Sequence, residues 1–303
     1  MYDIIIVGGG PAGLCAAIYA RRANKSVLIL EKNAFGGQIV FSPKVENYPG
    51  FESISGSELA DKLVSQVLAQ GADVEGETVT SIRCEGNRRF VETEEGNTYQ
   101  GSAVIIANGA RHRHLGLPNE ERFIGDGISF CAVCDGAFYK NKTVALIGGG
   151  NSALQEAILL SEGCKKVYVI QNLDFLTGEM RLQELLQKRG NVEIITGTVV
   201  SAIADTPEFS GITVERVADG TKTELALDGM FVAIGLVPEN EAFADLAKLN
   251  AAGYFDTDER CLTDTPGVFV AGDCRSKAIR QVSTATADGA VAALAACRYI
   301  DEL

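Results

Sequence analysis

Gly8-Gly9-Gly10-Pro11-Ala12-Gly13 is the stretch that decides the fold. The continuous apolar run Tyr2–Val7 precedes it, and residues 13–22 follow with the apolar spacing of a helix. In a strand, glycine turn and helix of this kind, backbone N–H groups and the helix N-terminus bind a dinucleotide pyrophosphate. The next predicted strand, 26–30, ends at Glu31, about twenty residues after the glycines, where a carboxylate can accept both ribose hydroxyls of an adenosine. All parts of the pattern occur together, which makes the alternative, a glycine turn needed only for tight packing, the weaker interpretation.

The same unit recurs in the middle of the chain. Residues 143–147 form a predicted strand, Gly148-Gly149-Gly150-Asn151-Ser152-Ala153 the turn, 153–161 the helix and 167–170 the next strand. Short alternating strands with Gly-Asn or Asp-Gly turns lie between and after these units, and such meanders commonly cover one face of a dinucleotide-binding sheet. The sequence therefore predicts an α/β protein with two Rossmann-like dinucleotide-binding domains of the three-layer ββα type.

Between the two glycine turns lies Cys131-Ala132-Val133-Cys134-Asp135-Gly136. Two thiols at this spacing can close and open a disulfide without moving the backbone, so in a reducing compartment the pair indicates catalysis or a metal site. Zinc held by both cysteines with His112 and His114 is the metal alternative; we expect no metal, because no second Cys-x-x-Cys exists and the ligand order is unusual. Six other cysteines lack pair spacing and are expected to be buried, inert thiols: Cys15, Cys84, Cys164, Cys261, Cys274 and Cys297.

Composition narrows the range of partners. The 303 residues suffice for roughly two domains of about 150 residues. Lysine and arginine total 27 against 40 acidic residues, and a net charge of −13 argues against binding nucleic acid or an anionic membrane. The apolar runs are far shorter than the ~18 residues of a membrane span, and no charged leader precedes the first strand. We expect a cytoplasmic protein whose partners are small molecules or proteins.

The chain resembles the low-molecular-weight thioredoxin reductases, a family of FAD-dependent flavoproteins with two dinucleotide-binding domains. The resemblance covers nearly the whole length. Besides both glycine turns and the dithiol, it rests on four stretches in the family's order: Gly36-Gly37-Gln38, Val45-Glu46-Asn47-Tyr48-Pro49-Gly50, Gly267-Val268-Phe269-Val270-Ala271-Gly272-Asp273 and Arg280-Gln281. It implies a homodimer and an FAD domain split into residues 1–112 and 246–303, with a dithiol domain, 113–245, inserted between them.

The resemblance also implies site residues. Cys134 would be the flavin-facing sulfur, Cys131 the sulfur that attacks a thioredoxin-like disulfide, and Asp135 the general acid and base; a cap for a helix beginning near Cys134 is the alternative role of Asp135. For Asp273 the alternative is a helix cap or turn aspartate. The residues expected to hold FAD are Gly8, Gly10, Pro11, Ala12, Gly13, Glu31, Lys32, Gly37, Gln38, Asn47, Gly272, Asp273, Arg280 and Gln281. His112 and His114 are interpreted as linker or surface residues.

One stretch departs from the family. Members that use NADPH carry arginines after the second strand of the inserted domain, where guanidinium groups bind the adenosine 2′-phosphate. Here Asn172, Leu173 and Thr177 occupy those positions, and residues 170–172 supply no acid for the ribose of NADH. This pattern predicts a donor other than NADPH, as in the pyridine-nucleotide-independent relatives that use ferredoxin or a second flavin.

With such a donor, the turn residues Gly148, Gly150 and Ala153 would bind a second nucleotide. The alternative is that they only allow the helix to pack against the strand. A basic cluster (Lys165, Lys166, Lys188 and Arg189) would have to receive an acidic ferredoxin. Two alternatives stay open: a conventional NAD(P)H-dependent thioredoxin reductase, and a flavin-binding redox sensor or partner subunit that turns over no disulfide.

Overall fold

The chain folds into two compact units in the computed structural model, which describes residues 1–42 and 45–303. The first unit comprises Met1–Arg111 and Val237–Leu303, and the second, inserted between them, is His112–Leu236. The sequence placed the second boundary after residue 245. The structure places it nine residues earlier, because Phe243, Leu246 and Ala247 pack in the core of the first unit beside Ile5.

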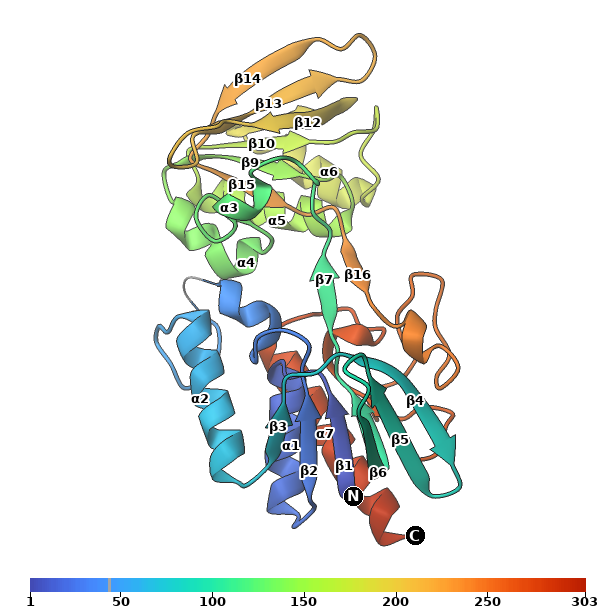
Figure 1. Cartoon of the computed structure of the whole chain (residues 1–303). Coiled ribbons are helices and arrows are strands. Elements are labelled where there is room, and N and C mark those ends of the chain that lie inside the picture. Colours follow the sequence, from blue (N-terminus) through green and yellow to red (C-terminus); the bar gives the residue numbers. More distant parts are fainter. Residues whose placement is uncertain (43–44) are drawn as a thin grey trace. The chain divides into compact units, whose positions relative to one another are not determined.

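The first unit is built on a seven-stranded sheet in the order β3-β2-β1-β6-β5-β4, with β17 paired to β6 (Figure 1). Strands β3, β2, β1, β6 and β17 run parallel, whereas β4, β5 and the start of β6 form an antiparallel meander. The elements are β1 (Tyr2–Val7), α1 (Pro11–Arg22), β2 (Val27–Leu30), η1 (Gly37–Phe41), α2 (Gly56–Ala69), β3 (Asp73–Glu75), β4 (Val79–Glu85), β5 (Arg88–Thr93), β6 (Thr98–Ile106), η3 (Glu241–Phe243), β17 (Val268–Val270), η4 (Gly272–Cys274) and α7 (Val282–Asp301).

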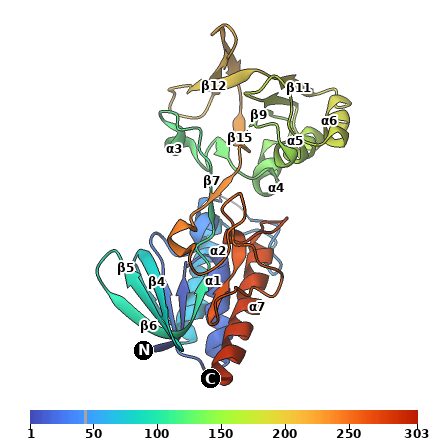
Figure 2. The ribbon, with the colours of Figure 1, turned by 90° about the vertical axis from the view of Figure 1, so that its right-hand side faces the viewer.

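Two cores cover the two faces of this sheet. Ile4 and Ile6 of β1 point to the face where α1, α2 and α7 pack, and Ile5 and Val7 point to the opposite core, which includes side chains of the meander. Figure 2 shows the meander and α7 on opposite sides of the first unit. Helices α1 and α7 approach closely: a Cβ on Gly289 would lie 2.1 Å from the carbonyl oxygen of Ala12. This contact brings the segment before α7 against the start of α1.

The second unit repeats the plan with a five-stranded parallel sheet, β11-β10-β9-β15-β8, and a three-stranded antiparallel sheet, β12-β13-β14. Its elements are α3 (Glu120–Phe123), β8 (Ile128–Ser129), α4 (Ala132–Asp135), η2 (Gly136–Tyr139), β9 (Thr143–Ile147), α5 (Asn151–Gly163), β10 (Lys166–Ile170), α6 (Met180–Gln187), β11 (Val192–Ile195), β12 (Thr198–Ile203), β13 (Gly211–Arg216), β14 (Lys222–Ala226) and β15 (Gly229–Val232). The short strands β7 (Ala110–His112) and β16 (Leu236–Pro238) pair where the chain passes between the units.

The predicted fold class is confirmed: both units are α/β, and each has a parallel sheet, helices and an antiparallel meander. Within residues 1–42 and 45–303, no helix is both long enough and apolar enough to cross a membrane.

Candidate functional site

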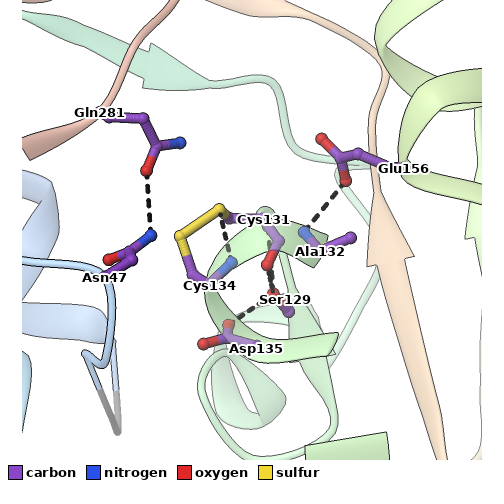
Figure 3. The surroundings of a disulfide bond; sticks show 8 residues. All are labelled: Asn47, Ser129, Cys131, Ala132, Cys134, Asp135, Glu156 and Gln281. Atoms are coloured by element: carbon purple, nitrogen blue, oxygen red, sulfur yellow. Dashed lines mark hydrogen bonds between the residues drawn. A yellow bond between two sulfur atoms is a disulfide. The ribbon is translucent and has the colours of Figure 1, made fainter. Parts of the chain in front are cut away.

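Cys131 and Cys134 form a disulfide with a Cα–Cα separation of 5.3 Å (Figure 3). Cys131 ends the segment after β8 and is the N-cap of α4; its Sγ accepts a hydrogen bond from the Cys134 N–H at 3.2 Å. Both cysteines are half-buried, and the side chain of Val133 between them is 55% exposed. The pair therefore lies near the surface of its unit.

Asp135 is the last residue of α4 and is buried. Its Oδ2 accepts a hydrogen bond from the Ser129 hydroxyl at 2.6 Å, whereas its Oδ1 has no hydrogen-bond partner among the described residues. Burial raises the pKa of this carboxyl, against a smaller lowering by Ser129. Cys131 caps α4, and Asp135 stands at the N-cap position of η2, where its side chain makes no capping hydrogen bond. A buried carboxyl with one free oxygen and a raised pKa suits proton transfer.

Two further residues, Ser129 and Glu156, contact the segment of the dithiol, and the sequence analysis did not identify them. Ser129 bonds Asp135 and also accepts the Cys131 N–H at 3.1 Å, so it joins the acid to the cysteine backbone. Glu156, from α5, accepts the Ala132 N–H at 3.2 Å through Oε2, and burial raises its pKa to about 7 (Figure 3). Neither lies in a recognisable motif, although Ser129 stands two residues before Cys131 in the sequence.

The first glycine turn has the geometry that a pyrophosphate requires. Gly8 has a positive φ of 109°, and a Cβ there would lie 2.3 Å from a backbone oxygen. A Cβ on Gly13 would lie 1.9 Å from the Gly8 carbonyl oxygen, so α1 can start this close to β1 only with glycine. Gly10 is the N-cap of α1 without a side-chain cap, and Pro11 and Ala12 form the first turn. The N–H groups at this end are thus left for an anion.

Glu31 lies where the sequence predicted it, at the end of β2, and is buried. Its Oε2 accepts the Gly9 N–H at 2.7 Å and its Oε1 the Asn33 N–H at 2.8 Å. These bonds fix the carboxylate beside the turn. The adjacent Lys32 forms an ion pair with Glu239. A contact of Lys32 with the cofactor stays a prediction.

The segments expected on the flavin side come together within the first unit. Gly37 has a φ of 60°, and a Cβ there would lie 3.2 Å from the Cα of Gly10. Gln38 follows it in η1 and is exposed. Asn47 donates a hydrogen bond from Nδ2 to Oε1 of Gln281 at 3.2 Å, joining two segments 234 residues apart (Figure 3).

The last cofactor segment follows β17. Gly272 has a φ of 80°, and a Cβ there would lie 2.8 Å from the Cβ of Ala12, so the segment abuts the first turn of α1. Asp273 lies within the short 3-10 helix η4, whose N-cap is Ala271, and its Oδ1 is buried without a partner among the described residues. Burial raises the pKa of this carboxyl. The guanidinium of Arg280 lies 4.2 Å from the ring centroid of Tyr254 and donates to the Asp273 carbonyl at 3.4 Å.

The second glycine turn is intact. Gly148 has a φ of 134°, and Gly150 is the N-cap of α5. Ala153 is buried, and its Cβ would lie 3.1 Å from a Cβ on Gly148. Gln171 is buried at the end of β10, and its side chain packs over Gly149. A Cβ added to Gly149 would lie 2.6 Å from the Gln171 side chain.

The loop after β10 folds back onto this turn. Thr177 and Gly178 both donate backbone N–H groups to the Gly149 carbonyl, at 2.9 and 2.8 Å. Leu173 and Phe175 of the loop are exposed, by 41% and 62%. The positions that would carry arginines therefore present neutral side chains around the turn.

The remaining cysteines are scattered over both units. No group of three or more potential metal ligands occurs in the described part of the chain. Cys164, Cys261, Cys274 and Cys297 are buried as expected, while Cys15 and Cys84 are half-buried. Burial raises the pKa of all six thiols, which keeps them protonated near neutral pH.

His112 ends β7, where the chain passes between the units, and His114 is exposed, in line with their interpretation as linker or surface residues. Both rings stack on Phe130, the residue before Cys131, with centroids 5.0 Å apart in each pair. Burial lowers the pKa of His112 to about 4. The sequence could not show these ring contacts, because they join residues that are distant from one another along the chain.

Comparison with known proteins places these features in a family. The family model described as pyridine nucleotide-disulphide oxidoreductase matches residues 2–289. The 34.2 kDa protein in the rubredoxin operon of Clostridium pasteurianum is 43% identical over 98% of this chain and 97% of its own length. Thioredoxin reductase of Listeria monocytogenes is 40% identical over 100% of this chain and 95% of its own. Among solved structures, thioredoxin reductase from Streptococcus pyogenes superposes with a TM-score of 0.93 at 39% identity, covering 100% of this chain and 99% of that one.

Proposed function

Since the chain belongs to the pyridine nucleotide-disulphide oxidoreductases and, within them, to the low-molecular-weight thioredoxin reductases, we propose that it reduces the disulfide of a thioredoxin-like protein through Cys131 and Cys134. FAD is the cofactor typical of this family, and the chain is a flavoprotein oxidoreductase of the disulfide-reductase type. The observation that carries the proposal is the half-buried Cys131–Cys134 disulfide beside the buried carboxyl of Asp135. The alternative of a redox sensor without turnover loses its basis with the family assignment.

The residues of the first unit fit FAD. The turn at Gly8–Gly13 offers N–H groups to the pyrophosphate, and Glu31 is fixed beside it to accept the ribose hydroxyls. The unpartnered Oδ1 of Asp273 is a buried acceptor that a hydroxyl of the ribityl chain would satisfy. Arg280 and Gln281 would lie at the pyrimidine edge of the flavin, with Gly37, Gln38 and Asn47 beside the ring. When bound, FAD supplies the two electrons that reduce the disulfide.

The protein side of the reaction uses three residues. The Cys131 thiolate attacks the substrate disulfide, which forms a mixed disulfide and releases one substrate thiolate. Cys134 then attacks the Cys131 sulfur, which restores the internal disulfide and releases the second substrate thiolate. Asp135 holds the proton that a released thiolate takes up, and the Ser129 hydroxyl fixes its Oδ2 at 2.6 Å. For the half of the cycle in which the internal disulfide is reduced, Cys134 would be the sulfur that faces the cofactor.

The proposal also concerns which molecule supplies electrons to the protein. The family model is named for a pyridine nucleotide, and the relatives reported above name neither ferredoxin nor a second flavin. They favour the conventional alternative over the predicted unusual donor, so our first candidate is a pyridine nucleotide at the Gly148–Ala153 turn. Ferredoxin or a second flavin is the second candidate, because Asn172, Leu173 and Thr177 offer no cation for a 2′-phosphate. A homodimer and a cytoplasmic location also stay predictions.

The test is turnover of thioredoxin disulfide under anaerobic conditions with NADPH, NADH or reduced ferredoxin as donor. We expect Cys131→Ser and Cys134→Ser to abolish turnover, whereas the matched variant Cys84→Ser keeps it. A long-wavelength charge-transfer band should persist in Cys131→Ser and vanish in Cys134→Ser. Turnover in either active-site variant would refute the assigned roles, and the donor that reduces the flavin fastest decides between the two candidates.

A further inference from the structure

Glu156 is a second carboxyl group at the dithiol, and it comes from the helix of the second glycine turn. Its Oε2 accepts the N–H of Ala132, the peptide group that follows Cys131, at 3.2 Å. Helix α5, which carries Glu156, packs against α4. Figure 3 shows the carboxyl group of Glu156 directed at the Ala132 N–H at the start of α4, with Ser129 and Asp135 lower in the view. The dithiol is thus flanked by two acids held by different elements.

The surroundings of Glu156 supply no charge that neutralises it. Helix α5 packs against α4, η2, α6, β9 and β10. The titratable or charged residues of these elements and of the N-cap of α4 are Cys131, Cys134, Asp135, Tyr139, Lys166, Tyr168, Arg181 and Glu184. Among the described residues, none of their charges moves the pKa of Glu156: burial raises it to about 7, and the Ala132 N–H opposes that shift. The carboxyl group therefore changes charge in the range in which thiols at such sites react.

We propose that Glu156 is a positioning residue that holds the first turn of α4 and whose negative charge restrains thiolate formation on Cys131. The inference rests on the proposed redox role of the dithiol. An ionised carboxylate one peptide group away from Cys131 disfavours a second negative charge on that sulfur. Loss of a proton from the Cys131 thiol and from Glu156 is consequently coupled, and each makes the other harder. Asp135 then serves proton transfer, while Glu156 sets how readily Cys131 becomes a nucleophile.

The experiment measures the alkylation rate of Cys131 by iodoacetamide in the FAD-bound Cys134→Ser protein, from pH 5.5 to 9.5, with modification at Cys131 located by peptide mass. With Glu156 present, the rate should rise in two steps, because the carboxyl group and the thiol titrate in a coupled manner. Glu156→Gln should give a single step, with the Cys131 pKa lower by about one unit. Alkylation should then be up to about tenfold faster in the pH range where Glu156 is ionised in the parent protein and the Cys131 thiol is still protonated. Glu162→Gln removes an exposed acid of the same helix, one paired with Arg189, and should leave the profile unchanged.

A profile for Glu156→Gln that coincides with that for Glu162→Gln would overturn the proposal. Should Glu156→Gln fail to fold, Glu156→Asp keeps the charge and is expected to keep the two-step profile; a single step there refutes the charge coupling. Alkylation needs neither an electron donor nor thioredoxin. If the proposed function is wrong, turnover will be absent while the alkylation profile can still show the coupling. If only the role of Glu156 is wrong, turnover will be present and the alkylation profile will not change in Glu156→Gln.

Discussion

The two glycine turns are built on the same backbone. Gly8 donates its N–H to the carbonyl of Leu30 at 2.8 Å, and Gly148 donates to Ile170 at 2.9 Å. In both turns the third glycine is an N-cap in extended conformation without a side-chain cap. The chain therefore carries two cradles of one design, each with free N–H groups at a helix start.

What differs is the residue that lies over the middle glycine. In the first unit this is Glu31, whose carboxylate accepts the Gly9 N–H at 2.7 Å. In the second unit it is Gln171, equally buried, whose Nε2 donates to the Phe175 carbonyl at 3.4 Å. The turn serves any pyrophosphate, but recognition of a ribose depends on the group at the strand end. The comparison thus separates the turn geometry suited to a phosphate, which both units share, from the acidic residue expected to select the nucleotide, which only the first unit carries.

The largest difference between the turns should come from a single methyl group. Gly13→Ala places a Cβ 1.9 Å from the Gly8 carbonyl oxygen, so β1 and α1 must separate. We expect loss of retained FAD and destabilisation by about 3 kcal/mol, the upper end for overpacking. The converse change, Ala153→Gly, should cost about 1 kcal/mol in helix propensity and leave FAD bound. Flavin absorbance after desalting and the urea unfolding midpoint measure both; FAD retention by Gly13→Ala would show that the first turn is not the cofactor cradle.

Exchanging the residues over the middle glycines tests selection directly. Glu31→Gln should weaken FAD binding by about 10- to 100-fold, because charge-assisted bonds to the ribose are worth about 1.5–3 kcal/mol. Gln171→Glu should raise kcat/KM for NADH by about tenfold and leave FAD binding unchanged, with the exposed Gln187→Glu as a matched charge control. Stopped-flow flavin reduction gives the second value. No gain with NADH in Gln171→Glu would indicate that the second turn does not receive a pyridine nucleotide in catalysis.

Much of the fold could be predicted from the sequence because it depends on local patterns. The strands Tyr2–Val7 and Thr143–Ile147 have the predicted bounds, since each is an apolar run ending in a glycine turn. The boundary near residue 245 was wrong because Phe243 owes its place to the sheet of the first unit, a long-range contact. Asp135 stands at the N-cap position of η2, but its side chain makes no capping bond, and at the start of α4 it is the Cys131 sulfur that accepts the N–H.

The residues of the candidate site likewise fall into those that a sequence motif identifies and those that only tertiary contacts identify. The disulfide and the glycine turns have motif spacing, so their residues were named from sequence. Ser129 and Glu156 were missed because they act through tertiary contacts: the bond from Ala132 to Glu156 joins residues 24 positions apart and depends on α5 packing against α4. No pattern of residue types encodes such a contact.

A last difference between the two units should appear in the pH dependence of folding stability. Both histidines of the chain lie in the second unit, and burial lowers the pKa of His112 to about 4 in the folded state. In the unfolded chain a histidine titrates near 6.5, so the unfolded state binds more protons between pH 6.5 and 4, and folding stability falls as the pH drops through that window. Between pH 7 and 4.5 the loss should be about 2 kcal/mol. His112→Phe, which keeps a ring against Phe130, should remove this part of the pH dependence. Urea unfolding of the full chain at both pH values measures it, and equal losses in wild type and His112→Phe would mean that the His112 ring is not held neutral by burial.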